Sequence, residues 1–297
     1  MEPDLIGQIG DKLQEARLSF EVIGSVIFGS FAGGKATGES DLDLLVVGLG
    51  LPEKLHRRAR QIAEIKRTLP DLPLDVSLLT QEETFCNFAN HNPLFLDIAE
   101  DGILLFDRDG TLAEAMQETR QYVRERGITR IDGGWRFPVE PGVPTYLSRV
   151  STQDFARGRV IDSTRDLAIG RRLVQDAFYD KAVYHFQQSA EKAVKAVLIA
   201  LGVFQKSHLA GKALRDVLRE PRVPGIWQAP LLQAAAISEE LEPEHSLSRY
   251  PGIVNDALWL PSEEYTQEDA EAAGIKAGKA LEIAQGFMEV WFARPSG

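Results

Sequence analysis

A stretch of glycine and proline between residues 127 and 144 most constrains how this chain can fold. Proline lacks an amide hydrogen and clashes within a helix, and glycine weakens helix interiors, so no continuous helix can cross this stretch. After Gly127 at its start, the stretch contains Gly133, Gly134, Pro138, Pro141, Gly142 and Pro144. The 297 residues of the chain are enough for two domains of ordinary size. We therefore expect one domain at residues 1–126, a linker at 127–150 and a second domain at 151–297.

The first domain is expected to alternate helices and strands. Apolar runs at residues 22–28, 42–47 and 74–79 have the length of buried strands and are bounded by turn residues. Amphipathic segments between these runs predict helices. Thr80 and Glu83 match a capping box that opens a further helix. The expected fold is therefore α+β, with an α/β domain that contains a small mixed sheet.

The sequence after the glycine and proline stretch changes to a pattern of long helices. Apolar side chains recur at steps of three and four over residues 183–201, which is the spacing of one helix face. Gly202 is placed to end this helix. A cap formed by Thr266 and Asp269 opens the last helix, which continues to Trp291. The second domain is expected to be an all-α antiparallel helical bundle.

Composition excludes several classes of protein. The chain has 33 Lys and Arg against 44 Asp and Glu, a net charge of −11, which argues against DNA binding through a basic surface. The single cysteine, Cys86, has no disulfide partner in the chain and no ligands at zinc spacing. No apolar run approaches the roughly 18 residues that cross a bilayer, and the acidic N-terminus is unlike a signal peptide. We therefore expect a cytoplasmic protein without a membrane partner.

A basic run lies on a predicted helix of the first domain. It consists of His56, Arg57, Arg58, Arg60, Lys66 and Arg67. Because the run lies opposite the apolar stripe that contains Leu55 and Ile62, we expect it to be a solvated outer face.

Three aspartates and a glycine turn carry the candidate chemistry. Asp41 and Asp43 stand two residues apart at a predicted strand, so both carboxylates leave one face and can converge on a divalent cation. Gly29 permits a tight turn beside a phosphate, to which the Ser30 hydroxyl and nearby amides can donate hydrogen bonds. Asp75, on a separate strand, could complete a second metal site or take a proton from an attacking hydroxyl. Alternatively, Asp75 is a solvent-exposed carboxylate without a catalytic role.

These residues resemble the signature of the DNA polymerase β nucleotidyltransferase superfamily. The version Gly29-Ser30-Phe31-Ala32 with Ser40-Asp41-Leu42-Asp43-Leu44 is similar to its minimal branch, and the resemblance covers about residues 20–110. It implies Mg²⁺ held by Asp41 and Asp43, with Asp75 as the third catalytic and metal-binding acid. It also implies a nucleoside triphosphate, with ATP preferred, seated against Gly29, Ser30 and Ser40. The implied reaction transfers a nucleoside monophosphate to a hydroxyl acceptor and releases pyrophosphate.

The second domain resembles a HEPN domain over roughly residues 150–293. The resemblance rests on residues 179–196 and on Arg249-Tyr250-Pro251. Nucleotidyltransferase and HEPN modules are frequently neighbours or fusions, and many such pairs are toxin and antitoxin, with an RNase as the HEPN partner. The nuclease motif is an Arg followed four to six positions later by His, which none of the five histidines here completes. This departure counts against RNase activity. Related toxins are silenced by nucleotidylation of a Tyr near the nuclease motif, so without that motif Tyr250 has little support as a nucleotide acceptor.

Three hypotheses about function follow. The leading one is a Mg²⁺-dependent nucleotidyltransferase whose acceptor, a small molecule or a protein, lies between the two domains, with the helical domain contributing acceptor or partner binding. A second is a fused toxin–antitoxin-type regulator that nucleotidylates a protein, retains a degenerate HEPN RNase and forms a homodimer through its helices. A third is a nucleotide-binding sensor without turnover.

Overall fold

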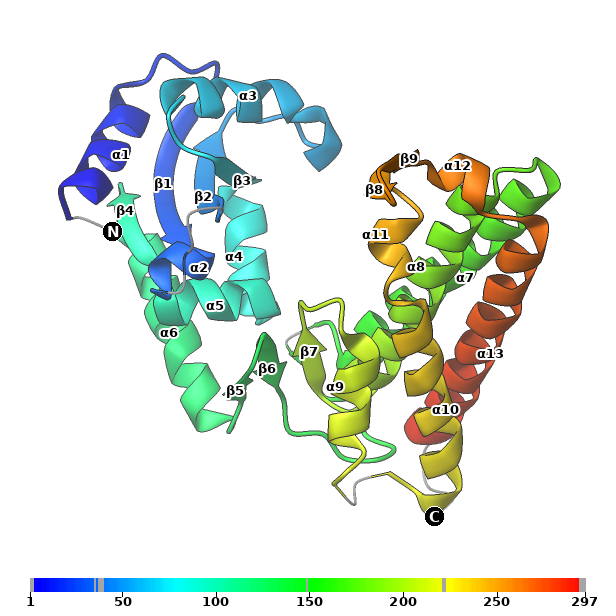
Figure 1. Ribbon diagram of the computed structural model, residues 1–297. Helices are drawn as coiled ribbons and strands as arrows, with labels where there is room; N and C mark the ends of the chain where they lie inside the picture. The colour runs from blue at the N-terminus through cyan, green and yellow to red at the C-terminus, as the bar shows by residue number, and fades with distance from the viewer. Residues whose placement is uncertain (1–2, 35, 37–39, 148, 221–222, 294–297) are drawn as a thin grey trace. The chain divides into compact units, whose positions relative to one another are not determined.

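The computed structural model describes residues 3–34, 36, 40–147, 149–220 and 223–293 (Figure 1). The chain divides into two compact units, Met1–Gly127 and Ile128–Gly297, which we call the N-terminal unit and the C-terminal unit. No helix in the described ranges is both long enough and apolar enough to span a membrane.

The N-terminal unit is built around a four-stranded sheet. The strand order is β3-β2-β1-β4, with β1 antiparallel to both of its neighbours and β2 parallel to β3. The sheet is therefore mixed, and the predicted α/β character of this region is confirmed. The elements are α1 (Pro3–Glu15), β1 (Glu21–Phe28), α2 (Gly29–Ala32), β2 (Leu42–Leu49), η1 (Leu55–Arg57), α3 (Ala59–Thr68), β3 (Leu74–Thr80), α4 (Gln81–Ala89), α5 (Pro93–Asp101), β4 (Ile103–Asp107) and α6 (Thr111–Glu125).

Helices cover both faces of this sheet, as Figure 1 shows. Successive side chains of a strand point to opposite faces. On β2, Leu44 and Val46 pack in the cluster that includes α1 and α3, whereas Leu45 and Val47 pack in the cluster that includes α4, α5 and α6. Asp43 therefore lies on the α4–α6 face, at the start of β2.

Arg58 contradicts the expectation that the whole basic run is solvated. Its side chain is 1% exposed, and by volume it stands first among the fully buried side chains of the described residues. The guanidinium donates hydrogen bonds to the Glu83 carboxylate at 2.5 and 2.9 Å and to the carbonyl oxygens of Pro52, Leu78 and Glu53 at 2.8, 3.1 and 3.1 Å. These partners offset the cost of removing the charge from water. The other basic residues of the run are exposed, as expected.

Both predicted capping boxes are confirmed. The Glu83 amide donates to the Thr80 hydroxyl at 3.1 Å, and the Thr80 amide donates to the Glu83 carboxylate at 2.8 Å. The same reciprocal pair joins Thr266 and Asp269 at the start of the last helix. Glu83 therefore serves both the start of α4 and the burial of Arg58.

The C-terminal unit is a helical bundle, as predicted. Its central helix α8 packs against α7, α10 and α13. The elements are β5 (Thr129–Ile131), β6 (Gly134–Arg136), α7 (Thr152–Gln175), α8 (Tyr179–Ala200), β7 (Val203–Gln205), α9 (Ala210–Val217), α10 (Gly225–Leu241), α11 (Glu244–Leu247), β8 (Gly252–Val254), β9 (Ala257–Trp259), α12 (Pro261–Glu264) and α13 (Gln267–Phe292).

The segment expected to be a linker holds two short strands. β6 pairs with β7, with Trp135 opposite Phe204, and the side chains of Trp135 and Phe137 are buried. The Phe137 amide donates to the Gly202 carbonyl at 2.8 Å, and a Cβ on Gly202 would lie 2.3 Å from the Phe137 carbonyl oxygen. Glycine and proline forbid a long helix here but permit three-residue strands. The division into two domains and a linker stays a prediction.

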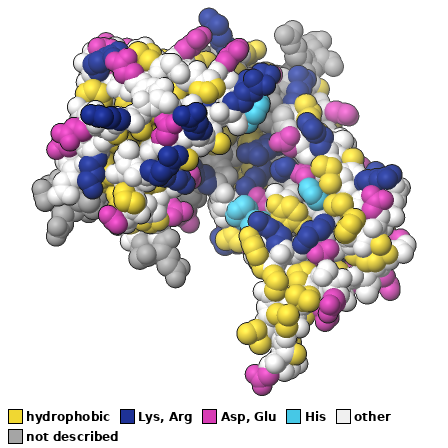
Figure 2. Space-filling model, turned by 90° about the horizontal axis from the view of Figure 1, so that it is seen from above, with side chains coloured by type: hydrophobic (Ala, Val, Ile, Leu, Met, Phe, Trp, Pro, Cys, Tyr) yellow, Lys and Arg dark blue, Asp and Glu magenta, His cyan; other side chains and the backbone are white. Residues whose placement is uncertain are grey.

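Side chains of both charges are mixed on the face that Figure 2 shows. Lys and Arg are interspersed with Asp and Glu over this face of both units. Among the described residues, basic side chains on this face therefore alternate with acidic ones.

Candidate active site

Strand register brings two of the three predicted aspartates together. Asp43 of β2 pairs with Asp75 of β3 in a parallel ladder, so the two side chains leave the same face of the sheet. On its other side Asp43 pairs with Phe28, the last residue of β1. The carboxylates therefore lie where β1 ends and where β2 and β3 begin.

The backbone of Gly29 lies against the Asp43 carboxylate. Its φ of +70° belongs to the left-handed region that favours glycine. A Cβ at this position would lie 1.9 Å from Oδ2 of Asp43, which leaves no room for any side chain. The turn therefore places the backbone of α2 against the Asp43 carboxylate.

The remaining predicted residues flank this point. Asp41 is exposed and immediately precedes β2, and Ser30 and Ser40 are half-buried on either side of the connection. The Leu42 amide donates to the Pro73 carbonyl at 2.7 Å and ties the beginnings of β2 and β3 together. Within that connection, residues 35 and 37–39 lie outside the described residues.

The donor set fits a hard divalent cation. No three His, Cys, Asp or Glu side chains in the described part of the chain are grouped closely enough to enclose a metal ion. Mg²⁺ is commonly held by one or two carboxylates together with water and substrate phosphates, so a pair of aspartates beside a glycine turn suits it. The structure places Asp43 beside Asp75 by strand register, and Asp41 lies just before the first residue of β2.

The sequence analysis missed a further acid near this site. A Cβ built on Gly33 would lie 3.5 Å from Oδ2 of Asp101, at the end of α5. Helices α2 and α5 are in contact, which explains this approach. No spacing in the sequence connects Asp101 with the aspartate motif, because the contact depends on how α5 crosses the sheet.

A second cluster of polar side chains lies in the C-terminal unit. The guanidinium of Arg249 lies 5.1 Å from the ring centroid of Tyr184 and 4.8 Å from that of Tyr250. Both distances suit cation–π interactions. The Arg-Tyr-Pro element noted in the sequence is therefore packed, through Arg249, against α8.

A buried glutamate and two histidines adjoin this element. Glu191 is 5% exposed, accepts a hydrogen bond from Lys195 at 2.8 Å and lies 3.1 Å from Nδ1 of His208. Burial acts to raise the pKa of Glu191, but the hydrogen bond and charge of Lys195, together with the hydrogen bonds of Gln187 and His208, leave the pKa lowered. The ring centroids of His208 and His245 lie 4.4 Å apart. The pKa of His245 is lowered, mainly by burial and secondly by the charge of His208.

Comparison with known families matches the two units separately. The family described as polymerase beta nucleotidyltransferase matches residues 9–111, and the HEPN domain family matches residues 161–289. The aspartates and Gly29 fall within the first match, and the Arg-Tyr-Pro element falls within the second.

Comparison with individual proteins gives relatives that each match less than half of this chain. A toxin candidate of Methanocaldococcus jannaschii is 38% identical over 124 residues, which cover 42% of this chain and 82% of the relative. A protein adenylyltransferase candidate of the same organism is 25% identical over 128 residues, which cover 42% of this chain and 87% of the relative. The crystal structure of an archaeal HEPN homologue is 28% identical, with a TM-score of 0.34, and covers 45% of this chain and 97% of its own.

Proposed function

We propose that this chain, which belongs to the polymerase β nucleotidyltransferase and HEPN families with one domain of each, transfers a nucleoside monophosphate to a hydroxyl acceptor. The donor is a nucleoside triphosphate, and pyrophosphate is released. The observation that carries the proposal is the register of Asp43 with Asp75 beside Gly29. It unites a carboxylate pair and a glycine turn where β1 ends and where β2 and β3 begin.

Each residue of the site has a role in the proposed transfer. Asp41 and Asp43 would hold Mg²⁺, with water and phosphate oxygens as its other ligands, and the bound ion would neutralise charge on the phosphate oxygens. The Ser30 hydroxyl donates to a phosphate oxygen, together with amides of the turn and Ser40. Asp75 takes the proton of the acceptor hydroxyl while the hydroxyl oxygen attacks the α-phosphorus. The bond from the α-phosphorus to the bridging oxygen breaks, and pyrophosphate leaves.

We favour a protein hydroxyl as acceptor and ATP as donor. One relative is a protein adenylyltransferase candidate and another is a toxin candidate, and this chain joins the families of both kinds of domain. The HEPN-family domain would then bind the acceptor or partner. Tyr250, whose side chain is 55% exposed, is the acceptor to examine first within the chain.

The test uses the purified full-length chain with Mg²⁺ and α-labelled ATP. We expect labelled protein and released pyrophosphate, with the modified residue located by mass spectrometry. Asp43→Asn and Asp75→Asn should each lower the rate by at least about 100-fold, because each removes a charge worth several kcal/mol at the transition state. Asp71→Asn, an exposed aspartate four residues before Asp75, should leave the rate unchanged.

Two outcomes would contradict this proposal. Nucleotide binding without label or pyrophosphate, even with cell extract added, would favour the sensor hypothesis. Pyrophosphate release with an unlabelled protein fraction would point to a small-molecule acceptor. A homodimer through the C-terminal unit is a further part of the proposal, and sedimentation of the full-length chain tests it.

A further inference from the structure

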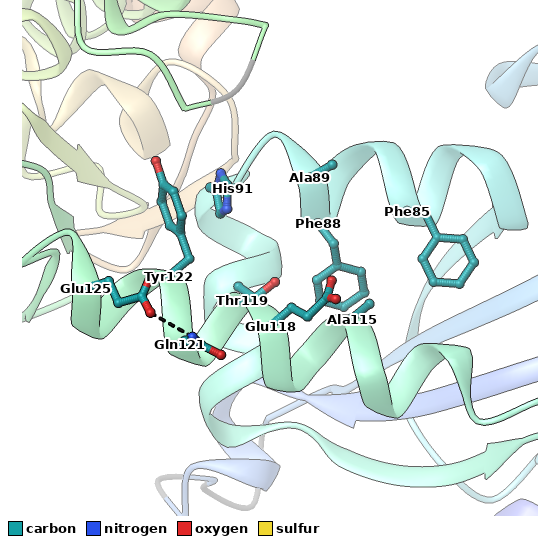
Figure 3. Close-up of a pocket in the computed structure, with 10 residues that line it drawn as sticks. All are labelled: Phe85, Phe88, Ala89, His91, Ala115, Glu118, Thr119, Gln121, Tyr122 and Glu125. Atoms are coloured by element: carbon teal, nitrogen blue, oxygen red, sulfur yellow. Dashed lines mark hydrogen bonds between the residues drawn. The ribbon is translucent and has the colours of Figure 1, made fainter.

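A pocket lies between α4 and α6 of the N-terminal unit (Figure 3). Its volume is about 460 Å³, which falls in the range of sites for small organic ligands. None of the predicted active-site residues is among the described residues that line it. The pocket is therefore separate from the site of the proposed transfer.

The floor of the pocket is apolar and belongs to the core. Phe88 is 3% exposed and packs edge-to-face on Phe95, with ring centroids 4.8 Å apart. Ala115 of α6 is also buried, and Phe85 is half-buried beside them. Because Phe88 and Ala115 pack in the core, the floor offers a fixed hydrocarbon surface to a ligand.

An aromatic wall closes one end. The rings of His91 and Tyr122 stack at a centroid distance of 3.4 Å with an interplanar angle of 14°, and Figure 3 shows them side by side. The guanidinium of Arg126 lies 5.5 Å from the Tyr122 ring centroid. His91 has a φ of +47°, uncommon for a residue with a side chain, and its amide donates to the Phe88 carbonyl at 2.9 Å. Tyr122 is therefore held in place before any ligand arrives.

The carboxylates of the lining are its charged side chains among the described residues, and Arg126, whose guanidinium faces the Tyr122 ring, lies outside the lining. Glu118 and Glu125 line the pocket, and among the described lining residues there is no Lys or Arg. Glu125 accepts a hydrogen bond from Gln121 at 2.7 Å, and Glu118 is exposed. Carboxylates beside aromatic rings attract a cation and repel phosphate.

We propose that this pocket binds a small amphipathic amine. The protonated amino group lies against the Glu118 carboxylate, and an aromatic or branched apolar group packs on Phe85, Phe88 and Tyr122. This site goes beyond the proposed nucleotidyl transfer, and its test needs neither nucleotide nor metal ion.

The experiment titrates the full-length chain with two matched probes. Phenethylammonium carries the ring and the charge, whereas 2-phenylethanol carries the ring alone. Calorimetry should show saturable binding of the amine at least about tenfold tighter than that of the alcohol. The NMR signals of the His91 and Tyr122 rings should shift with the same saturation curve.

Two carboxamide variants identify the charge that matters. Glu118→Gln should weaken amine binding about fivefold and leave alcohol binding unchanged. Glu114→Gln, at an exposed position one turn earlier on α6 and not in the lining, should bind both probes as the wild type does. Equal affinity for both probes, equal effects of the two variants, or no saturable shift of the two rings would each overturn the proposal.

Discussion

At the scale of single residues, Gly29 and the Asp43 carboxylate share one small space. A methyl group at Gly29 would overlap Oδ2 of Asp43, and the carboxylate would have to turn away. We therefore expect Gly29→Ala to lower the rate of nucleotidyl transfer about 100-fold, because a displacement of about 1 Å at a reacting group has this effect. Pyrophosphate release measures the rate. Alanine is also disfavoured in the left-handed backbone conformation of this position, so Gly29→Ala should lower the free energy of unfolding by about 1–2 kcal/mol.

Gly50 provides the control for this substitution. Its φ of +76° is close to that of Gly29, but a Cβ at Gly50 would meet no atom within 4 Å. Gly50→Ala should therefore show a similar loss of stability with an unchanged rate of transfer. Equal rates in the two alanine variants would mean that the position of Asp43 does not depend on Gly29.

The same scale shows how far the sequence could predict this site. The spacing of Asp41 and Asp43 predicts a shared face, because alternation along a strand is a local property that spacing reveals. The structure begins β2 at Leu42, so Asp41 lies just before the strand. Burial of Arg58 depends on Glu83 and on carbonyl groups of a loop and of β3. Helical periodicity cannot predict these partners, because they lie outside the helix pattern of the basic run. Asp101 likewise approaches Gly33 only through packing between α2 and α5.

At the scale of elements, hydrogen bonds of Arg58 link the start of α4 to β3 and to the segment before η1. Arg58→Met would leave Glu83 and three carbonyl groups without this donor. We expect a loss of about 3 kcal/mol in the free energy of unfolding, as for the breaking of other buried ion pairs. Urea denaturation measures the loss, and Arg57→Met, at the exposed neighbour, should change stability by less than about 0.5 kcal/mol.

This ion pair also predicts a pH dependence. The hydrogen bond from Arg58 holds the pKa of Glu83 below its usual value of 4.5. The contribution of the pair is therefore complete above pH 4.5 and is lost as the pH falls through the folded-state pKa of Glu83. The stability difference between wild type and Arg58→Met should narrow in acid. A difference that stays constant to low pH would mean that only the carbonyl contacts matter.

The packing of α11 against α8 predicts a second pH effect, through His245. Burial and the charges of His208, Arg249 and Lys195 lower its pKa, against the opposing charge of Glu191. Below the ordinary value of 6.5 the unfolded chain takes up a proton that the folded chain resists. The free energy of unfolding should therefore fall as the pH decreases from about 6.5. Thermal melts of His245→Asn should show a weaker decline, whereas His56→Asn, at an exposed site, should follow the wild type.

At the scale of the whole molecule, the sequence predicted the helical bundle better than the small sheet beside it. Long amphipathic helices repeat their pattern over many turns, so periodicity detects them. Strands β5, β6 and β7 have three residues each, and β7 follows β6 only after two long helices. Segments this short show no recognisable periodicity of apolar residues. In addition, the glycine and proline residues around β6 led to the prediction of a linker at this position.

The position of β6 decides where the second domain begins. A fragment of residues 128–297 keeps Trp135 and Phe137, which are 2% and 1% exposed, and keeps the contact of Phe137 with Phe204 at 5.1 Å between ring centroids. A fragment of residues 151–297 loses both side chains, and each buried aromatic residue removed costs about 3–5 kcal/mol. We therefore expect the longer fragment to melt cooperatively and the shorter one to melt at least about 10 °C lower or not to fold. Circular dichroism melts of the two fragments provide the comparison, and equal melting temperatures would show that residues 127–150 are a linker after all.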